Sequence, residues 1–84
     1  MNKIQFTITA FNKDNETIYG STVLDTASIE TVLAINDEIF DESTLFQVQA
    51  WVDGKSVYNS GKFDKIDLDI FLDAAELEVE KVIE

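Results

Sequence analysis

The chain has 84 residues, of which 17 are Asp or Glu and 6 are Lys, with no Arg, His or Cys. These counts exclude disulfides, thiolate metal sites and imidazole or thiolate catalysis, so we expect a non-enzymatic protein without cofactor or metal. The net charge of −11 argues against contact with nucleic acid or an anionic membrane and favours a basic protein surface as partner. Length and the lack of a long apolar run or leader pattern predict a single cytoplasmic domain, residues 1–84.

The first part of the chain predicts a hairpin. Residues 3–11 alternate apolar and polar side chains, which is typical of a half-buried strand. A polar turn at residues 12–16 leads into a second alternating stretch, residues 17–24, so the two strands should pair in antiparallel fashion. One side of the second strand is expected to carry Ile18, Thr22 and Leu24.

The next segment predicts a helix. Asp25, Thr26 and Ser28 are candidate N-caps, and apolar residues then recur at helical spacing to about residue 42. Asn36 is the polar exception within this apolar stripe.

A second hairpin follows. Residues 44–52 return to a period of two, and Asp53-Gly54 is typical of a two-residue turn into a strand over residues 56–62. Within that last strand, Ser60-Gly61 indicates either a bulge or an early end.

From Asp67 onward the apolar period becomes helical again and predicts a helix of about four turns or more. Its core-facing stripe is expected to comprise Leu68, Leu72, Ala75, Val79 and either Val82 or Ile83. Alternation over residues 65–71 leaves a short strand open as an alternative at this point.

Together these elements predict an α+β domain with the element order ββαββα. A four-stranded, mostly antiparallel sheet should carry two acidic amphipathic helices on one face, leaving the other face to Thr, Gln and aromatic side chains. That open face is expected to comprise Gln5, Thr7, Thr9, Phe11, Tyr19, Ser21, Leu45, Gln47, Gln49, Trp51 and Tyr58.

The charge is concentrated in the two predicted helices. Residues 25–42 hold six carboxylates and no lysine, and residues 64–84 hold eight carboxylates and two lysines. The remaining residues, 1–24 and 43–63, hold three carboxylates and four lysines. The predicted strands are therefore nearly neutral, and the helices carry the negative field.

Acidic side chains on the second helix recur at spacings that place them in a ridge along one side. Like charges at i,i+4 destabilise a helix, and acids near a helix C-terminus oppose its dipole, as Asp41 and Glu42 do on the first helix. Positions occupied against stability tend to mark function, although a charge run can also be a solvated face. The predicted partner-binding residues are Asp37, Glu38, Asp41, Glu42, Asp69, Asp73, Glu76, Glu80 and Glu84.

A second, shorter apolar stripe of Ile70, Ala74 and Leu77 lies on the far side of this acidic ridge from the core stripe. Either the core extends around the helix to include these residues, or they are left for a partner.

In size and charge the chain is similar to the DNA-mimic inhibitors encoded by phages, such as uracil-DNA glycosylase inhibitors, anti-restriction proteins and anti-CRISPR proteins. The resemblance implies a phage or prophage inhibitor whose carboxylates stand in for phosphates at the basic, nucleic-acid-binding site of a partner protein. Two alternatives remain open. One is a phage or bacterial structural or assembly domain that self-associates through its sheet, for example as a homodimer. The other is an immunity or antitoxin-type protein.

Overall fold

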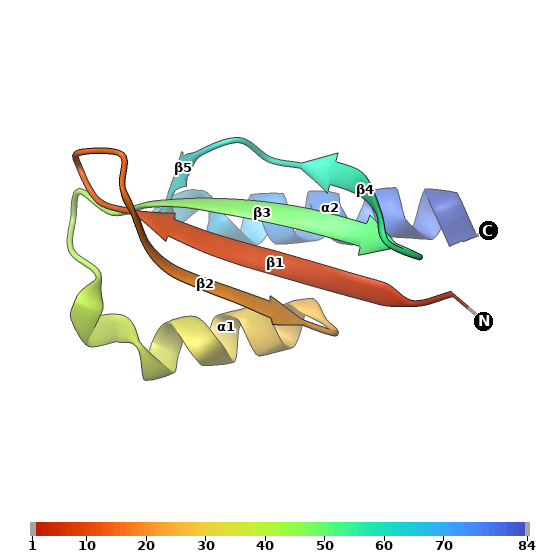
Figure 1. The fold of residues 1–84 in the computed structure, drawn as a ribbon, viewed down its shortest axis with the longest axis horizontal. Helices are drawn as coiled ribbons and strands as arrows, with labels where there is room; N and C mark the ends of the chain where they lie inside the picture. Colours follow the sequence, from red (N-terminus) through yellow and green to blue (C-terminus); the bar gives the residue numbers. More distant parts are fainter. Residues whose placement is uncertain (1, 84) are drawn as a thin grey trace.

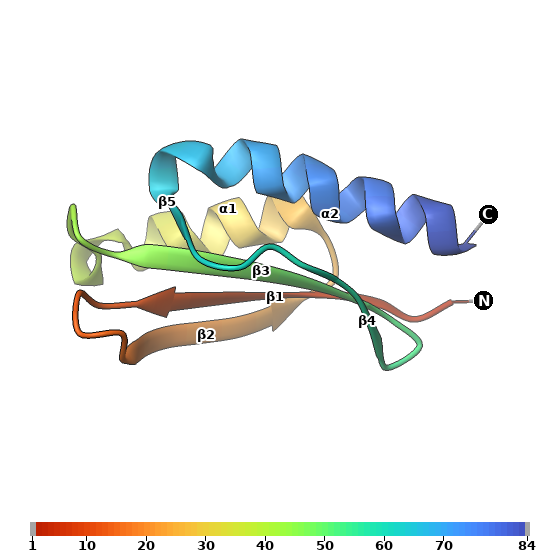
Figure 2. The same ribbon diagram turned by 90° about the horizontal axis from the view of Figure 1, so that it is seen from above.

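The computed structural model describes residues 2–83, which form an antiparallel sheet with two helices on one of its faces (Figures 1 and 2). The strands are β1 (Ile4–Phe11), β2 (Thr17–Val23), β3 (Leu45–Val52), β4 (Lys55–Asn59) and β5 (Phe63–Asp64). The helices are α1 (Thr26–Ile35) and α2 (Leu68–Ile83), with the 3-10 turns η1 (Asp37–Ile39) and η2 (Lys65–Asp67). The predicted α+β class is confirmed, whereas the element order is ββαβββα.

The sheet has five strands instead of the predicted four. The last predicted strand ends early, at Asn59, and Phe63–Asp64, beyond its predicted end, form a fifth strand. The strand order is β2-β1-β3-β4, and β5 also pairs with β3. The break falls at Ser60-Gly61, where Gly61 has a φ of 71°. The Ser60 N–H donates to the Val48 carbonyl, and the Ser60 hydroxyl accepts from the Val48 N–H, each at 2.9 Å. The Ser60 hydroxyl thus provides the hydrogen-bond acceptor for the Val48 N–H of β3 at the point where the backbone of the neighbouring strand turns away.

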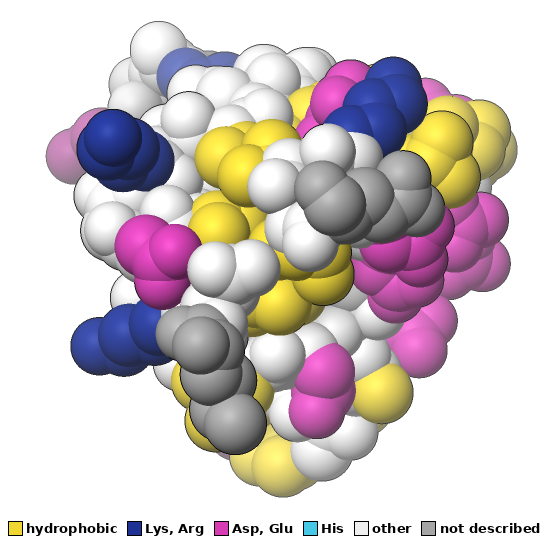
Figure 3. All heavy atoms as spheres, turned by 90° about the vertical axis from the view of Figure 1, so that its right-hand side faces the viewer, with side chains coloured by type: hydrophobic (Ala, Val, Ile, Leu, Met, Phe, Trp, Pro, Cys, Tyr) yellow, Lys and Arg dark blue, Asp and Glu magenta, His cyan; other side chains and the backbone are white. Residues whose placement is uncertain are grey.

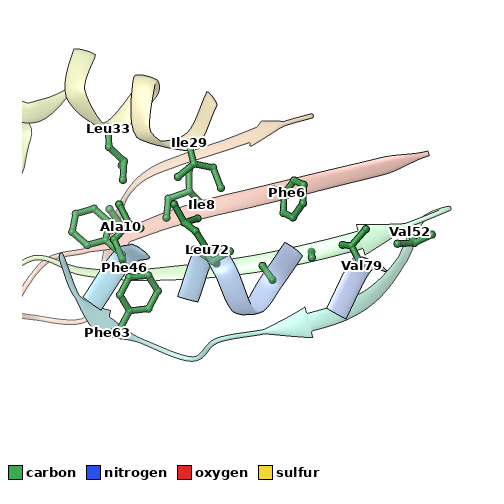
Figure 4. Close-up of a cluster of buried hydrophobic side chains, with 14 residues drawn as sticks. Phe6, Ile8, Ala10, Ile29, Leu33, Phe46, Val52, Phe63, Leu72 and Val79 are labelled. Carbon is green, nitrogen blue, oxygen red and sulfur yellow. The ribbon is translucent and has the colours of Figure 1, made fainter. Parts of the chain in front are cut away.

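The core lies between the sheet and the two helices. Strands β1 and β3 alternate as predicted, with Ile8 and Val48 among their fully buried side chains. Figure 4 shows Ile29 and Leu33 of α1 and Leu72 of α2 in the same buried cluster. The buried hydrophobic residues are Phe6, Ile8, Ala10, Ile29, Leu33, Phe46, Val48, Ala50, Val52, Phe63, Leu68, Leu72, Ala75 and Val79.

Strand β2 is turned the other way from its predicted orientation. A bulge between Ala10 and Phe11 shifts the pairing by one residue, and Tyr19 then lies opposite the buried Ala10. Ser21 therefore also faces the helices, and Leu24 is 71% exposed.

Tyr58 also faces the helices instead of lying on the open face. A register shift between Ala50 and Trp51 places Tyr58 opposite the buried Ala50. Burial, together with nearby Glu78 of α2, raises the pKa of Tyr58 above its usual value.

Helix α1 begins as predicted but ends much earlier. Asp25 is the N-cap, and its Oδ1 accepts the Ser28 N–H at 2.7 Å. The helix stops at Ile35 because Asn36 leaves the helical conformation, with its Nδ2 donating to the Val32 carbonyl at 2.7 Å. Asn36, the polar residue within the predicted apolar stripe, is therefore the C-cap of α1.

Helix α2 confirms the second predicted helix, with 16 residues and a length of about 24 Å. Its buried stripe ends at Val79, because Val82 and Ile83 are 52% and 40% exposed. The alternative strand over residues 65–71 is wrong, because only Phe63 and Asp64 pair with β3 before the chain turns into η2. Helix α2 packs against β3 and β4, whereas α1 packs against β1 and β2.

A row of aromatic rings crosses one end of the core and ties its elements together. Successive ring centroids from Tyr19 to Phe40, Phe46, Phe63 and Phe71 lie 5.9, 5.2, 6.4 and 4.5 Å apart. These contacts fall within the range of favourable aromatic packing. The aromatic row links β2, the loop before β3, β3 itself, β5 and α2.

Two positions on α1 test how this helix packs on the sheet. We expect Leu33→Ala to destabilise the fold by about 2–5 kcal/mol, because Leu33 is only 2% exposed and its loss leaves a cavity. The matched change Ile35→Ala should cost within about 0.5 kcal/mol, because Ile35 is 73% exposed. Urea unfolding of both variants measures the difference, and equal costs would contradict this placement of α1.

The Asp25 cap makes stability depend on pH. Hydrogen bonds from Ser28, chiefly from its backbone N–H, lower the pKa of Asp25 below its usual 3.8. A carboxyl with a lower pKa in the folded state stabilises the fold above the unfolded pKa and loses that effect as the pH falls through the folded pKa. Asp25→Ala should therefore lower the Tm at pH 7, and the difference from wild type should shrink below pH 3.8 and be lost below the folded pKa of Asp25.

Asp25→Asn provides the control for this prediction. An Asn side chain caps a helix about as well as Asp but does not titrate. This variant should therefore keep most of the stability and lose the part of its pH dependence that Asp25 contributes. Thermal melts from pH 2 to 7 measure both effects, and an Asp25→Ala deficit that persists in strong acid would contradict the ionised cap.

Candidate functional site

The acidic ridge of α2 faces α1. Its described members, Asp69, Asp73, Glu76 and Glu80, are all exposed, and the Thr26 hydroxyl at the start of α1 donates to the Glu76 carboxylate. Glu84, the last predicted member, lies outside the described residues. The ridge therefore borders the space between the two helices and does not project away from the domain.

The two helices enclose an acidic hollow of about 380 Å³. Glu30 of α1 lines it together with Asp69, Asp73 and Glu76 of α2, and Leu72 is also in the lining. Glu30 was not among the predicted site residues. It is the only charged residue of α1, but the sequence does not reveal that this side of α1 meets the ridge of α2.

A second acidic hollow, of about 610 Å³, lies where the loop before β3 meets the start of α2. Asp37, Asp41 and Glu42 line it, as predicted for a shared surface, and Asp64 and Lys65 complete it. The Lys65 ammonium lies 3.1 Å from the Asp37 carboxylate, but both side chains are more than half exposed, so the ion pair contributes little stability. Glu38 is exposed on η1 and does not line this hollow.

Asp41 has a local structural role that sequence reasoning missed. It lies in the loop beyond η1, so the predicted opposition of Asp41 and Glu42 to the dipole of the first helix is wrong. The Asp41 carboxylate accepts the Ser43 hydroxyl at 2.6 Å and the Ser43 N–H at 2.8 Å. These hydrogen bonds lower the pKa of Asp41. Asp41 therefore stabilises its own turn, as Asp commonly does in loops.

A third hollow, of about 370 Å³, opens at the far end of α2. Its lining is mainly apolar, with Phe6 and Val79 among the residues, and Glu76 and Glu80 border it. Figure 3 shows acidic side chains gathered on the helical side of this end of the molecule, beside exposed apolar surface.

The carboxylates that line these three hollows form what we call the acidic band. The hollow between the helices shares Thr26, Ala27 and Glu76 with the apolar one, and Asp69 lies one turn after Lys65 of the loop hollow. The acidic band comprises Asp25, Glu30, Asp37, Asp41, Glu42, Asp64, Asp69, Asp73, Glu76 and Glu80.

The acidic band has about as many charges per unit length as one nucleic-acid strand, although they do not form a single row. Ten carboxylates in a molecule whose longest dimension is 38 Å average about one per 4 Å of that length. A DNA duplex carries one phosphate per about 1.7 Å of axis, and each strand one per about 3.4 Å. The ridge of α2 alone is sparser, so the loop and α1 carboxylates are needed to reach this density.

The carboxylates are spread out and do not converge on a point. Among residues 2–83, no group of three or more acidic side chains is arranged to hold a metal ion. Such an extended surface suits a partner that presents several separate cations.

The second apolar stripe of α2 is exposed and does not extend the core. Ile70 and Leu77 are 64% and 55% exposed, and Ile66, one turn earlier, is 88% exposed. Helical periodicity places Ile70 and Leu77 opposite the buried stripe and directly beside the acidic ridge. A partner that covers the ridge would therefore meet apolar side chains at its border.

No helix within residues 2–83 has the length and apolar character needed to cross a membrane. No protein-family model matches the chain, and no curated protein or solved structure matches it either.

Proposed function

We propose that this protein is a non-enzymatic inhibitor that uses its acidic band to occupy the basic, nucleic-acid-binding site of a partner protein in the cytoplasm. The observation that carries the proposal is the hollow between the helices, where Glu30 of α1 and the ridge carboxylates of α2 line one surface. The loop before β3 adds the carboxylates of a second hollow. Phage or prophage origin fits the small size and the net charge of −11.

Electrostatics supports a basic protein as the partner. Carboxylates attract the same lysine and arginine side chains that bind nucleic acid, and they steer association over long range. Direct binding to nucleic acid would instead bring phosphates against this band, which holds Lys65 as the one base among its lining residues.

The exposed apolar stripe adds contacts that phosphates cannot provide. Ile70 and Leu77 project beside the ridge, so a partner that covers the ridge also buries apolar surface. Apolar contacts persist at salt concentrations that screen charge pairs, and they let the protein distinguish one basic surface from another. An immunity or antitoxin-type role would use the same surface against a basic toxin.

The first prediction for the ridge concerns stability. The triple variant Asp73→Asn, Glu76→Gln, Glu80→Gln should raise the Tm by about 1–3 °C at low salt, because it removes like-charge repulsion along α2. Gln at position 76 retains an oxygen that can accept the Thr26 hydroxyl. Thermal melts measure the change, and a lower Tm would show that the ridge is structural.

The second prediction concerns binding. The wild-type protein on a resin should retain nucleic-acid-binding proteins from a bacterial lysate, and free duplex DNA should displace them. Raising NaCl from about 50 mM to about 200 mM should sharply reduce retention, because many charge pairs are screened together. The triple ridge variant should retain at least about tenfold less of the same proteins.

A charge-matched variant controls for net charge. Glu16→Gln, Asp53→Asn, Glu78→Gln removes three carboxylates that line none of the hollows of the acidic band and should leave retention unchanged. If both triple variants lost retention equally, net charge alone would explain the binding. Retention that neither DNA nor salt disturbs would rule out competition for a nucleic-acid-binding site.

A further inference from the structure

The strand residues on the face of the sheet opposite the helices are uncharged, and Lys62 reaches this face only at its rim, over the Phe11 ring. No other element of residues 2–83 covers this face, as Figure 2 shows. Side chains at alternate positions of β1 and β3 occupy its centre, and their partners on β2 and β4 flank them. This open face comprises Gln5, Thr7, Thr9, Phe11, Gly20, Thr22, Leu45, Gln47, Gln49, Trp51, Ser56 and Asn59, none of which is charged.

The polar groups of the open face are partly satisfied by one another. The Trp51 indole N–H donates to the Thr7 hydroxyl at 3.1 Å, and the Thr7 and Thr22 hydroxyls lie 3.3 Å apart. Gln47 donates to the Asn59 side-chain oxygen at 2.8 Å. Covering these groups therefore costs less than covering polar groups that depend on water for their hydrogen bonds.

We propose that the open face is a self-association surface, on which a second copy of this chain docks sheet to sheet about a twofold axis. The proposal is independent of the inhibitor function, because it uses the face that the acidic band does not.

The charge distribution selects a second copy as the occupant. A basic partner would find no carboxylate among the residues of the open face. A nucleic acid would find Lys62 at the rim, over the Phe11 ring, whereas nucleic-acid binding uses several cations. Another copy presents the same uncharged face, so the contact is self-complementary. Most carboxylates lie in residues 25–42 and 64–84, which form the helical layer and its flanking loops. A sheet-to-sheet dimer keeps these two layers on its outer sides.

The area is sufficient for a dimer. Strands β1 and β3 have eight residues each, and four strand positions at about 4.8 Å spacing give about 500 Å² per copy. Two copies then bury about 1,000 Å², which is the size at which specific interfaces begin. Half-buried Trp51 and Leu45 supply large side chains near opposite ends of β3, and Lys62 covers the Phe11 ring at the rim, 4.3 Å from its centroid.

Dimerisation and partner binding should respond to salt in opposite directions. Screening weakens repulsion between two chains of −11 each, so dimerisation should strengthen as NaCl rises from about 50 mM to about 200 mM. Capture of a basic partner should weaken over the same range. The two proposals can therefore fail separately.

The test is sedimentation velocity on the full chain over about a hundredfold range of concentration, with Trp51 emission as a second readout. Trp51 is the only tryptophan, and its emission should shift to the blue as the dimer forms. The variant Thr9→Glu, Gln49→Glu places carboxylates in the open face and should weaken dimerisation at least about 100-fold.

The control Thr31→Glu, Ala34→Glu adds the same charge to exposed positions of α1 and should dimerise like the wild type at matched salt. Circular dichroism melts verify that both variants fold. A wild-type chain that stays monomeric at the highest concentration and salt would overturn the proposal. Dimerisation of the open-face variant that equals that of the control would also overturn it.

Discussion

The packing of α2 across β3 is the contact on which the rest of the structure depends. Leu72, Ala75 and Val79 bury one side of the helix against the sheet, and this fixes the rotation of α2 about its own axis. Once that rotation is set, the acidic ridge must point toward α1, and Ile70 and Leu77 must point into water. The position of the surface charges is thus a consequence of the core.

Patterns that depend on neighbouring residues were predictable from the sequence, and those that depend on distant contacts were not. Alternation gave β1 and β3, and helical spacing gave α2 with its buried stripe. The orientation of β2 depends on a bulge opposite Ala10 and Phe11, and the end of α1 depends on Asn36, which also lies 3.4 Å from the Tyr19 hydroxyl. The division of the last strand likewise follows from Ser60 bonding to Val48, a partner in another strand.

The candidate site also divides into residues that could be predicted from local periodicity and residues that depend on distant contacts. Asp69, Asp73, Glu76 and Glu80 lie in one ridge as predicted, because helix periodicity alone determines their alignment. Glu30 joins them only because α1 and α2 line the same hollow. Asp41, by contrast, is explained by the turn that it stabilises. Glu76 likewise has a structural partner, because it accepts the Thr26 hydroxyl.

The aromatic row has a consequence for how the acidic band would meet a partner. It runs from Tyr19 through Phe40 and Phe63 to Phe71, and so joins the loop that carries Asp37 to the first turns of α2. Closely packed rings have few alternative arrangements, so the distance between the loop carboxylates and the ridge is largely set before any encounter. Such preorganisation limits the backbone entropy lost on binding and leaves only exposed side chains to be ordered.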